Sequence, residues 1–282
     1  MRYAGRMSDP VAPREVIAVV RALQAECGAV ARFIDENVRV LVDGRVAAVA
    51  HGIAFQGQLL RAIAWLRSLM KLTHPGDFQA VTAGARALFE GAVDVTLMRF
   101  DQAANGPEKM DAWEQSAKLK HAATALDYIT SAGRQPDGAE QMMVTYATGE
   151  RARIEKLRLA HWPNHKGKHP PRWTGRDLAQ DAEAADKHLA EGFEEFYRLR
   201  YPQLCWNVHG SGLTGLANIR AEYIPYIGGR AAADAAKFAT VVAEVVAKQM
   251  DCWNEDTFKK LSDQVSLAKV LAYTAVIPGA LG

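Results

Sequence analysis

Residues 231–253 read AAADAAKFATVVAEVVAKQMDCW, and this stretch shows best which kind of fold the chain adopts. Alanine and valine dominate it, and apolar side chains recur at helical spacing. The same character continues toward the C-terminus. We therefore predict one long apolar helix over about 231–276, preceded by a turn that contains Pro225, Gly228 and Gly229.

Helical patterns also dominate the rest of the chain. They predict helices at 14–42, 45–72, 77–104, 108–131, 139–160, 174–190 and 193–208, with a short helix ending near 223. Turns rich in Asp, Asn, Gly and Pro separate these ranges. Thr174 to Asp177 has the spacing of a capping box, and Pro202 interrupts the 193–208 helix. Without strand alternation, repeats or linkers, the sequence predicts an all-α, multi-helix bundle that forms a single domain over 1–282.

The composition is that of a globular protein, with 49% hydrophobic and 23% charged residues. No apolar run approaches the roughly 20 residues that a membrane span requires. The N-terminal residues lack the apolar centre of a signal peptide. Cys27, Cys205 and Cys252 form no CxxC pair, so we expect a cytoplasmic protein without disulfides or a structural zinc site. Phosphate-loop, dinucleotide-fold, zinc-protease and hydrolase motifs are absent, and we expect no cofactor.

Positive charge is concentrated in one segment. Residues 151–176 contain eight Lys or Arg and one acid, whereas the whole chain carries a net charge of only +2. Trp162 and Trp173 lie in the same segment. This asymmetry predicts an anionic partner, with the basic side chains on phosphates and the two indoles as stacking candidates.

His161, His165 and His169 occur at intervals of four within this segment. Three histidines can form a transition-metal site. Prolines deny them a common helical face, however, and the neighbouring Lys166 and Lys168 repel cations. We therefore favour a basic loop without metal, and the metal site remains the alternative.

Two further patterns suggest chemistry. Arg86 and Glu90 stand four residues apart, so they share a helix face and can form an ion pair or line a site together. His209 comes at the predicted end of a helix and just before Gly-Ser-Gly. The helix dipole there favours a protonated ring, which can act as a general acid or base. A purely structural capping role for His209 is the alternative.

Three ordered motifs run from about Ala80 to Leu216. They are Arg86-Ala-Leu-Phe-Glu90, Trp173-Thr-Gly-Arg176 and Tyr201-Pro-Gln-Leu-Cys-Trp-Asn-Val-His209-Gly-Ser211. With these motifs the chain resembles a mostly bacterial, all-helical family that is classed as a domain of unknown function. That family is similar to the HEPN superfamily of helical bundles. Many HEPN proteins are metal-independent ribonucleases of toxin–antitoxin and antiphage systems, in which an arginine contacts the scissile phosphate and a histidine transfers protons.

The resemblance implies site residues for this chain. The catalytic candidates are His209, Arg86, Glu90 and Arg198. The RNA-binding candidates combine the resemblance with the basic segment, and they are Arg158, Lys166, Lys168, Arg172, Trp173 and Arg176. We expect Arg86, Glu90, Trp173 and His209 to meet on one face. We also expect that Lys166, Lys168 and Arg172 can be replaced without loss of the fold.

One departure from the HEPN pattern favours a different function. Pro202, which carries no charge, stands seven residues before His209, where the HEPN motif has its arginine. The alternative is therefore a non-catalytic helical module that binds a protein partner or a second copy of itself. The surface expected for this contact is the C-terminal helix, with the apolar residues Val241, Val242, Val245, Val246, Met250 and Trp253.

Overall fold

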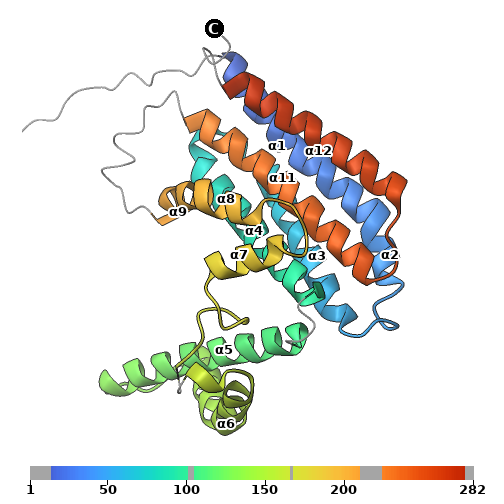
Figure 1. Cartoon of the computed structure of the whole chain (residues 1–282). Coiled ribbons are helices and arrows are strands. Elements are labelled where there is room, and N and C mark those ends of the chain that lie inside the picture. The colour runs from blue at the N-terminus through green and yellow to red at the C-terminus, as the bar shows by residue number, and fades with distance from the viewer. Residues whose placement is uncertain (1–13, 101–104, 166–167, 210–223, 277–282) are drawn as a thin grey trace, which may run out of the picture. The chain divides into compact units, whose positions relative to one another are not determined.

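The computed structural model describes residues 14–100, 105–165, 168–209 and 224–276, and these consist of helices and their connections without any strand (Figure 1). The all-α prediction is thereby confirmed for the described residues. The chain divides into two compact units. The first comprises Met1–Thr96 and Ala190–Gly282, and the second comprises Leu97–Leu189. That residues 1–282 act as one domain stays a prediction, and each unit is considered by itself.

The first unit contains most of the helices. Its N-terminal part has α1 (Arg14–Ile34), a π-helical turn (Asp35–Arg39), α2 (Val40–Asp43), α3 (Gly52–Leu69), a 3₁₀ turn (Pro75–Asp77) and α4 (Phe78–Phe100), whose last residues belong to the second unit. Its C-terminal part has α8 (Phe193–Leu199), α9 (Tyr201–His209), α11 (Ile224–Gln249) and α12 (Glu255–Val276). The predicted interruption at Pro202 is confirmed, because α8 ends at Leu199 and α9 begins at Tyr201.

Helix α11 is the centre of the first unit. It packs against α1, α3 and α12, and Figure 1 shows α1 (blue), α11 (orange) and α12 (red) side by side. Ala231, Ala235 and Ala239 on α11 are completely buried. Their small side chains let neighbouring helices approach closely, and burial of the apolar stripe stabilises the bundle.

The predicted long C-terminal helix is wrong in its boundaries. Pro225, Gly228 and Gly229 lie within the first turns of α11 rather than in a turn before it. Proline is compatible with a first turn because its missing N–H would have no helical partner there. Asp251, in the left-handed conformation at φ 52°, ends α11. The Cys252 N–H donates to the Ala247 carbonyl, as in a Schellman motif, and α12 starts three residues later, at Glu255.

The apolar residues expected to bind a partner form the core of the first unit instead. Val241, Val242, Val245, Val246 and Met250 are each at most 4% exposed. They are buried against neighbouring helices of the same unit, so they offer no free docking surface. Trp253 is 40% exposed and stacks on Phe258 of α12.

An aromatic cluster holds α8 and α9 in the first unit. The ring of Phe89 on α4 lies 4.8 Å from Phe196, 5.4 Å from Tyr201 and 5.1 Å from Phe238, measured between centroids. These distances are typical of favourable tilted and edge-to-face pairs. The cluster ties α4, α8, α9 and α11 together and positions the start of α9.

The second unit is a helical hairpin followed by a loop and a short helix. Helix α5 (Gly106–Ser131) packs along α6 (Gly138–His161), and Leu119, Ala122, Ala147 and Ile154 form a small core between them. A 3₁₀ turn (Pro163–His165) and a loop lead to α7 (Leu178–Asp186).

The capping box at the start of α7 differs from the one predicted at Thr174 to Asp177. The capping box consists of Asp177 and Gln180, each of which accepts a hydrogen bond from the backbone N–H of the other. Thr174 uses its hydroxyl elsewhere, on Asp181. In the part of the chain that the structure describes, no helix is both long and apolar enough to cross a bilayer.

Candidate functional site

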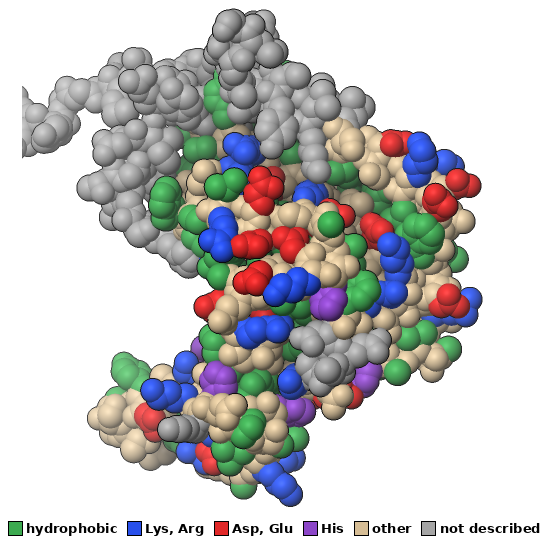
Figure 2. Space-filling model, viewed as in Figure 1, with side chains coloured by type: hydrophobic (Ala, Val, Ile, Leu, Met, Phe, Trp, Pro, Cys, Tyr) green, Lys and Arg blue, Asp and Glu red, His purple; other side chains and the backbone are tan. Residues whose placement is uncertain are grey.

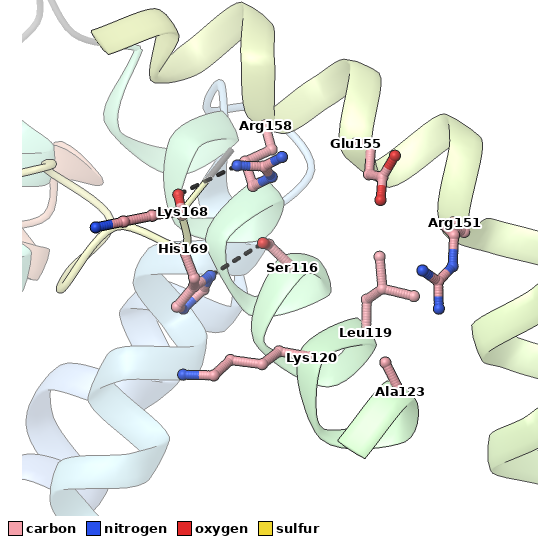
Figure 3. A pocket seen from close by; sticks show the side chains of 9 residues that line it. All are labelled: Ser116, Leu119, Lys120, Ala123, Arg151, Glu155, Arg158, Lys168 and His169. Atoms are coloured by element: carbon pink, nitrogen blue, oxygen red, sulfur yellow. Dashed lines mark hydrogen bonds between the residues drawn. The ribbon is translucent and has the colours of Figure 1, made fainter. Parts of the chain in front are cut away.

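The α5–α6 hairpin forms a pocket of about 470 Å³ in the second unit. Its lining combines positions that repeat at helical spacing on each helix with two loop residues; the full set is Ser116, Leu119, Lys120, Ala123, Arg151, Glu155, Arg158, Lys168 and His169. Figure 3 shows the α6 side chains reaching toward α5, with the loop closing one end. The hairpin thus gathers residues that are far apart in the chain.

Charge is the main property of this pocket. Lys120, Arg151, Arg158 and Lys168 contribute four cationic side chains, and Glu155 contributes the one carboxylate. On the face shown in Figure 2, Lys, Arg and His side chains lie over the hairpin, at the bottom of the view, among uncharged side chains and a few acidic ones. Like charges gathered around one cavity repel one another, and an anion placed among them relieves that repulsion.

His169 is held in a defined orientation at the end of the pocket. Its Nδ1 lies 3.0 Å from the hydroxyl of Ser116, and its ring lies 5.4 Å from that of Trp113. Ser116 is only 5% exposed. A serine hydroxyl can donate to a bare ring nitrogen or accept from a ring N–H, so the tautomer of His169 decides the direction of this bond.

The electrostatic surroundings favour the neutral ring. Burial, together with the charges of Lys120, Arg158 and His121, lowers the pKa of His169 below its ordinary value. At neutral pH the ring is consequently uncharged, and it carries one N–H donor and one nitrogen acceptor.

Two hydrogen bonds anchor the loop to the hairpin. Arg158 donates from Nη1 to the Lys168 carbonyl over 3.2 Å, and Trp113 donates from Nε1 to the Pro170 carbonyl over 3.1 Å. These contacts come from α6 and α5 respectively. The loop side of the pocket is therefore fixed by both helices.

The predicted RNA-binding residues separate into two groups. Arg158 and Lys168 line the pocket, and that they bind RNA stays a prediction. Arg172 and Arg176 instead bind the completely buried carboxylate of Asp181, with Nε–Oδ distances of 2.7 and 2.8 Å. These ion pairs give both arginines a structural role, and that Arg172 can be replaced without loss of the fold stays a prediction. Lys166 lies outside the described residues.

The Trp173-Thr-Gly-Arg176 motif also has a structural explanation. The side chain of Trp173 is 2% exposed, and its carbonyl accepts a hydrogen bond from Trp162 Nε1 over 3.0 Å. Gly175 has a backbone φ of +83°, which residues other than glycine rarely adopt. A Cβ at this position would lie 3.1 Å from the Trp162 side chain. Trp162 is 4% exposed. Neither indole is accessible for stacking on a base, so that prediction is wrong.

The histidines of the basic segment have separate surroundings. Among the described residues, no three His, Cys, Asp or Glu side chains are close enough together to hold a metal ion. His169 bonds Ser116, and the ring of His161 lies 5.5 Å from that of Trp162. The alternative of a metal site at these histidines therefore gains no support from the described residues.

In the first unit, Arg86 and Glu90 meet a residue that the sequence analysis did not select. Arg86 Nε lies 2.8 Å from Glu90 Oε1, and Tyr201 donates its hydroxyl to the same oxygen over 2.5 Å. The Arg86 guanidinium also lies over the Tyr201 ring, 5.4 Å from its centroid. Tyr201 opens the third motif, so the first and third motifs are in contact.

This cluster has strongly altered proton affinities. Burial disfavours the Arg86 cation, but the hydrogen bond and charge of Glu90 outweigh it and raise the pKa of the guanidinium. Burial and the hydrogen bond to Glu90 raise the pKa of the Tyr201 phenol as well. Near neutral pH the Arg86 guanidinium is therefore charged and the Tyr201 phenol is neutral.

The other catalytic candidates do not join this cluster in the described structure. Arg198 pairs with Glu194 on the surface of α8 and is 69% exposed in its side chain. His209 is the last residue of α9, about 12 Å along the helix axis from Tyr201, and its side chain lies outside the described residues. Trp173 belongs to the second unit. That these residues share one face with Arg86 stays a prediction.

A second pocket, of about 340 Å³, lies in the first unit and is lined by Arg200, Gln203, Leu204, Trp206, Asn207, Tyr226, Ile227 and Arg230. Arg200 is already engaged there, because its two terminal nitrogens bond Gln203 and the carboxylate of Asp234. This pocket therefore has less uncompensated positive charge than the hairpin pocket. The hairpin pocket is the stronger candidate for an anion site.

Comparison of the chain with protein-family models, with curated proteins and with solved structures finds no match. The candidate site consequently rests on its own geometry. Of its nine lining residues, only Arg158 and Lys168 were predicted from the sequence as RNA-binding residues, and Ser116 and Lys120 on α5 gave no signal that was used. The spacing of Ser116, Lys120 and Ala123 on one helix face was a usable signal, but its meaning depends on the α6 residues opposite.

Proposed function

We propose that the protein is directed at RNA and that the hairpin pocket binds RNA phosphate groups. The observation that carries this proposal is the concentration of four cationic side chains and one carboxylate around a single cavity. RNA presents a negative charge at every nucleotide. Contacts of Lys and Arg with phosphates supply most of the affinity of sequence-independent binding.

The surroundings of the pocket favour recognition of the backbone over recognition of bases. Trp162 and Trp173 are buried, so the basic segment lacks those two stacking platforms. Phosphate contacts position a nucleic acid without distinguishing its sequence. We accordingly expect binding that is sensitive to salt and only weakly dependent on base composition.

The proposal extends to an HEPN-like helical bundle in the bacterial cytoplasm, with metal-independent RNA cleavage in a toxin or antiphage system. It is supported by the order of the three motifs and by the contact of Glu90 with Tyr201, which links two of them. Pro202 in place of an arginine weighs against cleavage, as does the position of Arg86 at the opposite end of α9 from His209. RNA binding is therefore the main part of the proposal, and RNA cleavage is an additional part that has less support.

The alternative of a self-associating or partner-binding module has less support. Its expected surface on the C-terminal helix is buried within the first unit, as shown by Val242 and Val246 at 1% and 0% exposure. A dimer through that surface would require the unit to open. The described residues therefore favour the RNA proposal.

The test is fluorescence anisotropy with an end-labelled single-stranded RNA of about 15 nucleotides, titrated at several salt concentrations. The pocket variant is Lys120→Gln with Arg151→Gln, because Arg158 also anchors the loop. The matched control is Lys118→Gln with Lys156→Gln, which removes the same charge from exposed positions on the same two helices outside the pocket.

We expect the pocket variant to bind more weakly and its logarithmic salt slope to flatten by about 0.7 for each phosphate that it no longer neutralises. The control should change much less. Equal affinities for the two double variants would overturn the proposal, and so would an absence of RNA binding by the unaltered protein. Circular dichroism of both variants confirms that the helices remain.

A further inference from the structure

We propose that the hairpin pocket binds the terminal phosphate monoester of an RNA strand in preference to the phosphodiesters within it. This inference rests on the proposed function and names the part of the RNA that the site selects. It is carried by the charge balance of the pocket, by its size and by the oriented ring of His169 in its lining.

The charge balance favours a dianion. The four cationic side chains exceed the one carboxylate, Glu155, by three charges. A phosphodiester carries one negative charge, whereas a phosphate monoester carries about 1.5 to 2 at neutral pH. Because the attraction between the pocket and its ligand scales with ligand charge, the monoester gains more from the same side chains.

The size and lining suit the end of a strand. A cavity of about 470 Å³ is in the range that binds small ligands, comparable with one terminal nucleotide. Leu119 and Ala123 contribute an apolar part of the lining between the charged groups, and Figure 3 shows them beside Arg151. Sugar and base surfaces can lie against such a strip while the phosphate contacts the cations.

His169 adds an oriented polar group. The contact with Ser116 holds its ring in a defined orientation in the lining of the pocket. Lys120 and Arg158 are near enough for their charges to act on this ring. A phosphate that these cations attract is therefore bound beside this ring, and the additional terminal oxygen of a monoester supplies the Lys and Arg donors with an acceptor that a diester lacks.

The experiment is a competition assay. Three unlabelled strands of one sequence displace a labelled RNA from the full-length protein: one with a 5′-phosphate, one with a 3′-phosphate, and one with hydroxyls at both ends. We expect at least one phosphorylated strand to compete about ten-fold better than the hydroxyl strand, which is the effect of about one charge-assisted hydrogen bond. The better of the two phosphorylated strands identifies the end that is bound.

Matched variants test whether the tighter binding of a phosphorylated strand over the hydroxyl strand depends on the pocket. This advantage of the phosphorylated strand should disappear in Lys120→Gln with Arg151→Gln and persist in Lys118→Gln with Lys156→Gln. Glu155→Gln, which removes the opposing carboxylate, should increase it about two- to five-fold, the usual worth of one exposed charge. An unchanged advantage in the pocket variant would place the terminal phosphate elsewhere and overturn the inference.

The assay separates this inference from the proposed function. If all three strands compete equally while RNA binding still depends on Lys120 and Arg151, the inference fails and the proposed function stands. If no strand binds, both fail. Adenosine 5′-monophosphate distinguishes a free nucleotide from a strand end: displacement at the same concentration as the phosphorylated strand would overturn the assignment to RNA ends.

Discussion

Ser116 and His169, 53 positions apart in the chain, are joined by a hydrogen bond of 3.0 Å between Oγ and Nδ1. The serine is on α5, and the histidine is in the loop that follows α6. This bond fixes the orientation of the His169 ring in the lining of the pocket. Through this bond the hairpin defines the chemistry of the pocket.

The lowered pKa of His169 predicts a pH dependence of stability. The unfolded chain binds a proton at its ordinary pKa of about 6.5, whereas the folded protein binds it only at lower pH. Above about pH 7 the ring is neutral in both states and the free energy of unfolding is unaffected by it. As the pH falls from there toward the lowered pKa of the folded protein, the unfolded chain takes up the proton first, so the free energy of unfolding decreases. Urea unfolding between pH 5 and 8 at constant ionic strength should show a shallower dependence for His169→Gln than for the unaltered protein. Identical slopes would contradict the burial of a neutral ring.

Replacing Gly175 by alanine should destabilise the second unit by about 1–3 kcal/mol, because a side chain is strained at φ +83° and its Cβ would crowd Trp162. The control is Gly149→Ala, in the interior of α6, where a Cβ has no neighbour within 4 Å. That change should stabilise the helix by about 0.5–1 kcal/mol. Thermal and urea unfolding of both variants measure the difference, and effects of the same sign would contradict it.

Asp181→Ala should cost about 3–5 kcal/mol, because it leaves Arg172 and Arg176 without the buried carboxylate that both of them bind. The control is Glu183→Ala on the same helix, whose partner Lys187 is largely exposed and whose ion pair contributes about 0.5 kcal/mol or less. Urea unfolding of the two variants measures both costs. Equal costs would show that the Asp181 cluster is not what holds the loop on α7.

Any RNA cleavage by the protein should persist in a chelator and fall about 10²–10⁴-fold in His209→Gln, the usual contribution of a general acid or base. Cleavage of a labelled RNA followed on a denaturing gel measures the rate. His169→Gln is the informative comparison, since it should alter binding and leave the rate of the bound RNA unchanged. Cleavage that requires a divalent metal, or that survives in His209→Gln, would overturn this mechanism.

The sequence by itself determined the helical class and the positions of most helices, because apolar periodicity and turn residues act over a few positions. It also located the basic segment that contributes Arg151, Arg158, Lys168 and His169 to the pocket. It missed the end of α11, where Asp251 adopts a left-handed conformation that glycine usually marks.

Only the tertiary structure decided what each basic residue does. Arg158 and Arg172 look alike in the sequence, yet one lines a pocket and the other binds the buried Asp181. Trp173 looks like a stacking platform and is buried, while Ser116 and Lys120 gain their roles from residues that α6 and its loop place opposite them. The physical reason is that burial and pairing depend on how α5 packs on α6, and interactions between residues far apart in the chain leave no local periodic pattern in it.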